Sequence, residues 1–157
     1  GNLCQRTVSF AIKNCGQKIP EKIRFNEDDY KILNEFNLNI EKIRSRIDKQ
    51  DINFYIEFIV NSLFAANKYF NDQEPWKKKD DQVRLNTIVY TTLEIIRKIT
   101  FMLYPIIPQS SLKALKIFDL KEEDISFSTI TNHEFLKPGK KLNLIDILFK
   151  KIEKKDD

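Results

Sequence analysis

Glycine, proline, cysteine and histidine are all scarce in this chain of 157 residues. The three glycines and five prolines are too few for the many turns of a sheet-rich fold, and they favour long helices. No run approaches the ~20 consecutive apolar residues of a membrane span, and no secretory leader is visible at the N-terminus. These shortages predict a helical protein that works in the cytoplasm and makes no contact with a membrane.

The two cysteines and the single histidine cannot form the usual closed zinc site, so we expect no metal ligands. Cys4 and Cys15 fall in one predicted helix, in which the rise between them is about 16 Å. That rise far exceeds the ~7 Å limit between the α-carbons of a disulfide. Both thiols are therefore expected to be reduced and packed as small hydrophobic side chains, as in an intracellular protein.

Few residues could carry catalysis. His133 has no evident partner in the sequence, and the glycines at positions 1, 16 and 139 are isolated, so there is no phosphate-binding loop. The carboxylates fall at expected helix caps and on solvated faces, where a structural role is favoured. We expect no catalytic residue and no cofactor in this chain. The net charge of +4 permits a nucleic-acid partner but does not require one.

Apolar residues recur at three- and four-residue steps over three long segments, which is typical of amphipathic helices. These segments span residues 33–47, 52–70 and 85–103. A further helix is predicted over about 2–15, and a short one over about 110–118. Short connections between helices of this kind favour an antiparallel bundle.

Capping residues and a proline mark several helix ends. Asn26 and Asp51 are good N-caps for the second and third helices. Pro75 disfavours helical geometry at the residue before it, so the third helix should end near Gln73, and the fourth should begin around residues 80–81. The first helix starts with the chain and has no cap before it, which suggests a fragment of a longer polypeptide.

We therefore predict an all-α fold: an antiparallel bundle of about five helices in residues 1–120, followed by an irregular C-terminal tail over 121–157. Apolar and polar side chains alternate over 125–129, which favours an extended segment along a surface. A turn is predicted at 138–139. Residues 142–152 are apolar and fit either a helix or a strand.

The only tryptophan, Trp76, directly follows Pro75 at the predicted end of the third helix, and Lys77, Lys78 and Lys79 come next. An exposed aromatic ring beside cations fits an unpaired base and its phosphates. Two interpretations stay open for the indole, a partly buried cap on the end of the bundle or a stacking platform. For the lysines alone, a solvated approach to the next helix is the simpler interpretation.

Asn2 and Arg6 stand one helical turn apart and share a polar face with Ser9 and Lys13. The amide offers a donor and an acceptor together, and the guanidinium offers a rigid fork of donors, so the pair is suited to base edges. On spacing alone, an ordinary solvated face explains it as well. Tyr69, on the helix that leads to the tryptophan, is expected to serve packing rather than recognition.

Four motifs belong together. Residues 1–7 read GNLCQRT, residues 67–76 carry an Asn-Tyr-Pro-Trp pattern ahead of the lysines, residues 104–108 read YPIIP, and residues 148–153 read LFKKIE. They resemble motifs of the anticodon-binding bundle of methionyl-tRNA synthetases, whose closing motif has proline and arginine where this chain has two lysines. The resemblance covers most of the chain.

The resemblance implies that Trp76 stacks on the first anticodon base, a cytosine. It also implies that Asn2 and Arg6 contact bases of the same CAU triplet of a methionine tRNA, with Lys77–Lys79 as weaker contacts. The parent enzyme would join methionine to its tRNA using ATP and magnesium. Its nucleotide-binding signature needs two histidines, so the catalytic half lies outside this chain, and the tail would pack back on that catalytic body.

Two other functions stay open. Related anticodon-binding bundles serve the class I synthetases for cysteine, leucine, isoleucine and valine. A helical bundle can also be a protein-interaction module without an RNA function, and that alternative predicts an apolar patch facing solvent.

Overall fold

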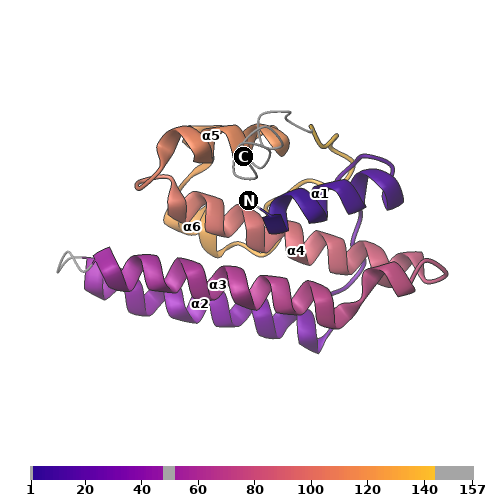
Figure 1. Ribbon diagram of the computed structural model, residues 1–157, viewed down its shortest axis with the longest axis horizontal. Coiled ribbons are helices and arrows are strands. Elements are labelled where there is room, and N and C mark those ends of the chain that lie inside the picture. The colour runs from indigo at the N-terminus through magenta and orange to yellow at the C-terminus, as the bar shows by residue number, and fades with distance from the viewer. Residues whose placement is uncertain (1, 48–51, 144–157) are drawn as a thin grey trace, which may run out of the picture.

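Helices dominate the computed structural model, which describes residues 2–47 and 52–143 (Figure 1). The elements in chain order are α1 (Asn2–Asn14), α2 (Glu27–Ile47), α3 (Ile52–Gln73), the 3-10 turn η1 (Pro75–Lys77), α4 (Gln82–Leu103), α5 (Pro108–Ile117), the 3-10 turn η2 (Glu122–Asp124) and α6 (Phe127–Thr131). Over this part of the chain the only β-pairing is an isolated antiparallel bridge between Lys18 and Lys141. The predicted all-α fold is confirmed.

The central element is α4. It packs against α1, α2, α3, α5 and α6, and Figure 1 shows the α2–α3 pair along one side of it with α1 and α5 along the other. Every residue of α4 from Thr87 to Met102 is buried as a result. A helix that is covered all round has no solvated face, so any charge it carries must find a partner in the interior.

Most of the predicted helix ends are confirmed. Asn26 and Asp29 bond each other's backbone amides through their side chains, at 2.9 and 3.0 Å, and α2 begins directly after Asn26. The Asp81 side chain accepts from the backbone N–H of Arg84 at 3.2 Å and caps α4. The third helix ends at Gln73, as the proline predicts. The predicted cap at Asp51 lies outside the described residues.

The predicted extended segment at residues 125–129 is wrong, because the chain forms α6 there. The Ser126 hydroxyl accepts from the backbone N–H of Thr129 at 3.2 Å, and the Thr129 hydroxyl accepts from the backbone N–H of Ser126 at 3.0 Å. This reciprocal capping starts a helix despite the alternating pattern. The predicted turn at 138–139 is confirmed, with Gly139 at φ 90°. The ambiguous segment 142–152 lies outside the described residues after Asn143.

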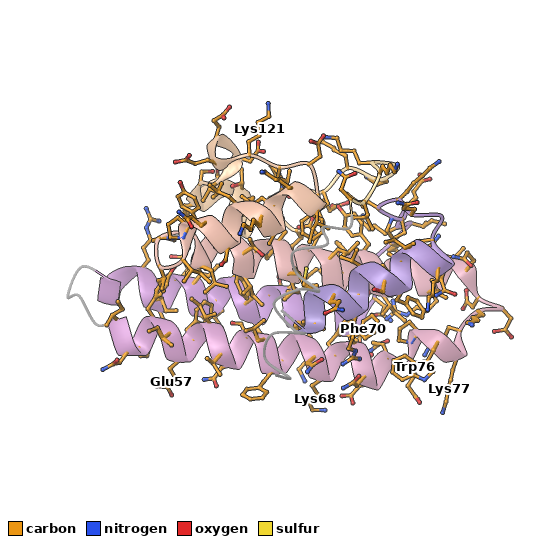
Figure 2. All side chains as sticks on the ribbon, turned by 45° about the horizontal axis from the view of Figure 1, so that its top comes forward. Glu57, Lys68, Phe70, Trp76, Lys77 and Lys121 are labelled. Carbon is orange, nitrogen blue, oxygen red and sulfur yellow. The ribbon has the colours of Figure 1, made fainter. Side chains whose placement is uncertain are left out.

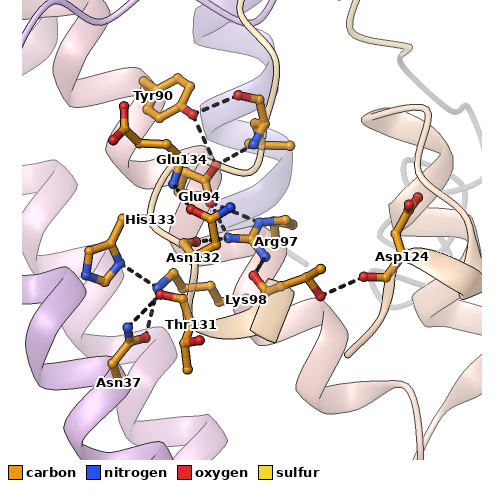
Figure 3. A network of polar contacts seen from close by, with 12 residues as sticks. Asn37, Tyr90, Glu94, Arg97, Lys98, Asp124, Thr131, Asn132, His133 and Glu134 are labelled. Carbon is orange, nitrogen blue, oxygen red and sulfur yellow. Dashed lines mark hydrogen bonds and ion pairs between the residues drawn. The ribbon is translucent and has the colours of Figure 1, made fainter. Parts of the chain in front are cut away.

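A buried ion pair on α4 holds part of the tail (Figure 3). Glu94 and Arg97 are both fully buried and pair with each other, against the expectation that the carboxylates sit at caps and on solvated faces. The guanidinium donates to the backbone carbonyls of Thr129 and Asn132, each at 2.6 Å. The Glu94 carboxylate accepts from the backbone N–H of Leu136 at 2.6 Å. These bonds fix residues 129–136 on α4.

Lys98 extends this network to α2. Its ammonium donates to Asn37 Oδ1 at 2.9 Å and lies 2.8 Å from His133 Nδ1, while His133 Nε2 lies 3.0 Å from Asn34 Oδ1. Burial lowers the pKa of Lys98 to about 7. Burial, together with the charges of Lys98 and Arg97, lowers the pKa of His133 to about 4. His133 therefore has partners that its place in the sequence did not reveal, and its role here is to hold the tail.

Replacing His133 with glutamine should flatten the acid side of the stability curve. Between pH 6.5 and about 4 the unfolded chain binds a proton on His133 that the folded chain does not bind, so stability is lost as the pH falls through this window. Thermal unfolding at pH 7 and pH 4.5 should show a smaller drop in Tm for His133→Gln than for the original chain. His133 is the single histidine, so its ring resonances in an NMR titration report its pKa directly. Parallel Tm curves, or a ring pKa near 6.5, would contradict this interpretation.

Candidate nucleic-acid interface

Trp76 lies in the turn between α3 and α4, at one end of the bundle (Figure 2). Glu74 takes a left-handed backbone conformation with φ 48° and ends the helical path, and the buried Pro75 starts the turn. The indole packs on Phe70, with ring centroids 6.1 Å apart and an angle of 57° between the planes. It is nevertheless 42% exposed. The ring is thus anchored on one side and open to solvent on another.

Arg6 reaches the same cluster from α1. Its guanidinium donates to Asn67 Oδ1 at 3.0 Å and to Asn71 Oδ1 at 2.7 Å, and its Cζ atom lies 5.4 Å from the centre of the Phe70 ring. Phe70 therefore contacts both Arg6 and Trp76 and joins them in one cluster of side chains. We call Arg6, Asn67, Phe70, Asn71 and Trp76 the indole cluster.

The role of the two asparagines as partners of Arg6 was not predicted. Asn67 and Asn71 stand one turn apart on α3, so both amides face α1. Asn67 was recognised only as part of a motif, because nothing in the local sequence says which helix will lie opposite. Their bonds use two of the five N–H donors of the guanidinium and fix its plane. An arginine held in this way is pre-oriented for a further planar partner.

Asn2 is the first residue of α1, but its side chain lies outside the described part of the structure. Its spacing from Arg6 places both residues on one face of the helix. A contact between the Asn2 amide and a ligand remains a prediction.

The three lysines after the tryptophan differ in their surroundings. Lys77 is exposed, and its ammonium lies 2.9 Å from Glu74 Oε2. Lys78 donates to the backbone carbonyl of Gln73 and so caps the end of α3. Lys79 is exposed. An exposed ion pair is worth no more than about 1 kcal/mol, so Lys77 can exchange its partner for a phosphate at little cost, whereas Lys78 is committed to the fold.

A buried carboxylate holds the two ends of the Trp76 turn. Asp29 is fully buried and accepts from the two terminal guanidinium nitrogens of Arg84, at 2.7 and 3.0 Å, and from the Tyr69 hydroxyl. Arg84 also donates to Gln73 Oε1 at 2.8 Å. Burial, and next the charge of Asp29, raise the pKa of Tyr69. The contacts join the start of α2 to the end of α3 and the start of α4, and they agree with a packing role for Tyr69.

The described residues can also be compared with the expectations for metal ligands, membrane spans and thiols. In residues 2–47 and 52–143, no group of three or more histidine, cysteine or acidic side chains could hold a metal ion. Within the same residues no helix is long and apolar enough to cross a membrane. Cys4 and Cys15 are free thiols, and burial raises the pKa of each to about 11.

An apolar stripe on α3 faces solvent, as the protein-interaction alternative predicts. Its members are Ile52, Ile56, Val60 and Phe64, at four-residue steps, with exposed fractions between 42 and 69%. Contiguous apolar surface of this kind suits contact with another protein domain. The stripe and the indole cluster occupy different parts of the helix.

Replacing Arg84 with glutamine should destabilise the chain far more than removing an exposed ion pair. The change leaves the Asp29 carboxylate buried without its cation, which typically costs about 3–5 kcal/mol. Lys77→Gln, which breaks the exposed pair with Glu74, is the matched control and should cost less than about 1 kcal/mol. Urea unfolding of both variants measures the difference. Equal losses would show that the buried pair does not hold the turn.

Comparisons with known proteins agree with this geometry. The sequence profile of a family described as the anticodon binding domain of methionyl tRNA ligase matches residues 19–157. The chain is 36% identical to methionine–tRNA ligase of Brucella suis biovar 1, over 83% of this chain and 25% of that protein. It is 33% identical to methionine–tRNA ligase of Rickettsia conorii, over 98% of this chain and 31% of that protein.

A solved structure is also similar. The free-state crystal structure of Mycobacterium tuberculosis methionyl-tRNA synthetase superposes with a TM-score of 0.84 and 30% identity, over 92% of this chain and 30% of that one. The chain thus spans only about a quarter to a third of the length of these relatives. The match to a methionine-specific family does not favour the cysteine, leucine, isoleucine or valine alternatives. The chain therefore belongs to the family of anticodon-binding domains of methionyl-tRNA ligases.

Proposed function

We propose that this chain recognises the anticodon of a methionine tRNA on behalf of a methionine–tRNA ligase. The observation that carries the proposal is the indole cluster, in which an exposed indole and a fixed guanidinium meet on the same phenylalanine. Bases of a single-stranded loop are recognised by stacking on aromatic rings and by hydrogen bonds to their edges. The cluster supplies both types of group within one surface.

Each member of the cluster has a separate task in this proposal. The exposed part of Trp76 stacks on the first anticodon base, a cytosine. Arg6, held by Asn67 and Asn71, donates to the edges of bases in the CAU triplet, and Asn2 on the same helix face adds an amide. Lys77 and Lys79 offer cations to the phosphates of the loop, with Lys78 the weakest of the three because it caps α3.

The catalytic step belongs to the rest of a longer parent protein. We propose that the parent uses ATP with magnesium to activate methionine; a structure of the Mycobacterium tuberculosis relative is a complex with methionyl-adenylate, which supports the ATP step. The apolar stripe on α3 and the tail after residue 120 offer surfaces for that catalytic body. We place the parent in the cytoplasm, where free thiols such as Cys4 and Cys15 stay reduced.

Truncating the indole should weaken RNA binding. Trp76→Ala should reduce affinity for a methionine tRNA anticodon stem-loop by roughly 5- to 150-fold, because stacking on an aromatic ring is worth about 1–3 kcal/mol. Trp76→Phe keeps an aromatic face and should lose less. Fluorescence anisotropy at a fixed, stated salt concentration measures both. Equal affinity of the alanine variant and the original chain, with matching far-UV spectra, would refute the stacking role.

The first anticodon base should matter to the original chain. Changing that cytosine to uracil should weaken binding by roughly 5- to 150-fold, since a good polar contact to a base offers about 1–3 kcal/mol of discrimination in duplex readout. In Arg6→Ala the discrimination across all three anticodon positions should shrink, whereas Arg24→Ala, which removes an exposed arginine outside the cluster, should leave it intact. An original chain that binds both RNAs equally would exclude base reading at this position.

A further inference from the structure

The isolated bridge between the loop after α1 and the end of the described tail forms a short, rigid ribbon. Ile19 donates its backbone N–H to the Lys140 carbonyl at 2.8 Å, and Gly139 donates to the Ile19 carbonyl at 2.8 Å. Leu142 donates to the Gln17 carbonyl at 2.9 Å. These three bonds join residues 17–19 to residues 139–142 side by side.

Buried and exposed side chains alternate along the two segments of this ribbon. Ile19 and Leu142 are buried, at 1% and 0% exposure, and anchor the ribbon to the bundle. Lys18 and Lys141, the bridged pair, are both exposed. Residues that face each other across an antiparallel pair have β-carbons only about 4.5–5.5 Å apart, and like charges in that position are destabilising. The fold therefore places two cations opposite each other, although the repulsion between their charges is unfavourable.

More positive charge surrounds the pair. Lys137 and Lys140 are exposed at the turn that leads into residues 141–142, and Lys140 has Asp119 as a partner at 3.1 Å. The ribbon and its turn therefore carry four lysines on a backbone that hydrogen bonds and buried anchors hold in place. A fixed group of cations of this kind fits a partner with regularly spaced negative charges.

The ribbon lies beside α1, whose other side bears Arg6 and the indole cluster. Figure 1 shows the final described segment passing next to the C-terminal half of α1, and in Figure 2 Phe70 and Trp76 lie on the opposite side of that helix. A hollow beside the ribbon is lined by the end of α1, the loop after it, the start of α4 and the turn at 138–139; its lining includes Asn14, Lys18, Gln82 and Asn86. A ligand that contacts both surfaces has to be extended and to cross α1.

We propose that Lys18 and Lys141, supported by Lys137 and Lys140, bind phosphates in the stem of the RNA whose loop reaches the indole cluster. The inference rests on the proposed function, because it assigns a second contact to the same RNA. Contacts to phosphates position a nucleic acid and add affinity without reading its sequence, whereas contacts to bases determine which sequence is bound. The lysine ribbon and the indole cluster thus have different tasks.

Lys18→Gln/Lys141→Gln tests the proposal, with Lys42→Gln/Lys121→Gln as the control of equal charge change on exposed positions elsewhere. Binding of an anticodon stem-loop is measured from low to high salt. The ribbon variant should lose about tenfold in affinity at low salt, and its slope of log K against log[salt] should become shallower by about 1–2, because two phosphate contacts are gone. The ratio of affinities for the normal and the base-changed anticodon should stay the same. Tm should stay equal or rise, because a like-charge pair has been removed.

A stemless RNA of the loop nucleotides alone gives the second arm. The ribbon variant and the original chain should bind this RNA with equal affinity, while Trp76→Ala should still bind it more weakly. One contrary outcome is that the ribbon variant binds the full stem-loop with unchanged affinity and salt slope while Trp76→Ala binds it more weakly, as expected. That result would refute phosphate binding by the ribbon and leave the proposed function standing. Equal loss in the Lys42/Lys121 control would also overturn it, because the effect would then be one of net charge. An original chain that binds neither RNA would defeat both proposals.

Discussion

The covering of α4 on all sides is the constraint on which the rest of the structure depends. Glu94, Arg97 and Lys98 in its buried stretch cannot reach water, and Arg84 near its start is mostly buried, so each one recruits a partner from another element. Near its start, Arg84 binds the buried Asp29 of α2, and in its middle Arg97 binds Glu94 and the carbonyls of the tail. One helix thereby decides where the Trp76 turn is held and where the segment after α5 lies.

The two ends of this arrangement differ in what they leave exposed. At the Asp29 end, the buried charge and the Tyr69 hydroxyl are fully engaged in the fold, so the turn beside them can present a large aromatic ring to solvent without losing its shape. A recognition surface gains affinity when its groups are already in place before the ligand arrives. The amides of Asn67 and Asn71 serve Arg6 in the same way, by removing the freedom that a long side chain would otherwise lose on binding.

Rigid placement also separates the lysines of this chain into two kinds. Lys98 is buried, loses much of its basicity and holds α2 to the tail through Asn37 and His133. Lys18 and Lys141 are exposed and oppose each other on a fixed ribbon, so their charge remains directed outward. The amino-acid composition does not distinguish these three lysines, although only the exposed pair, Lys18 and Lys141, can contact a polyanionic partner.

The sequence by itself determined the five longer helices and most of their ends, because apolar periodicity, Asn26, Asp81 and Pro75 act through local geometry. It also singled out Arg6 and Trp76. Only the tertiary structure decided that Glu94 and Arg97 are buried, that Asn67 and Asn71 orient Arg6, and that Lys18 faces Lys141. Those facts depend on which element lies opposite, and apolar periodicity marks the face of a helix that is buried but does not identify the element that covers it.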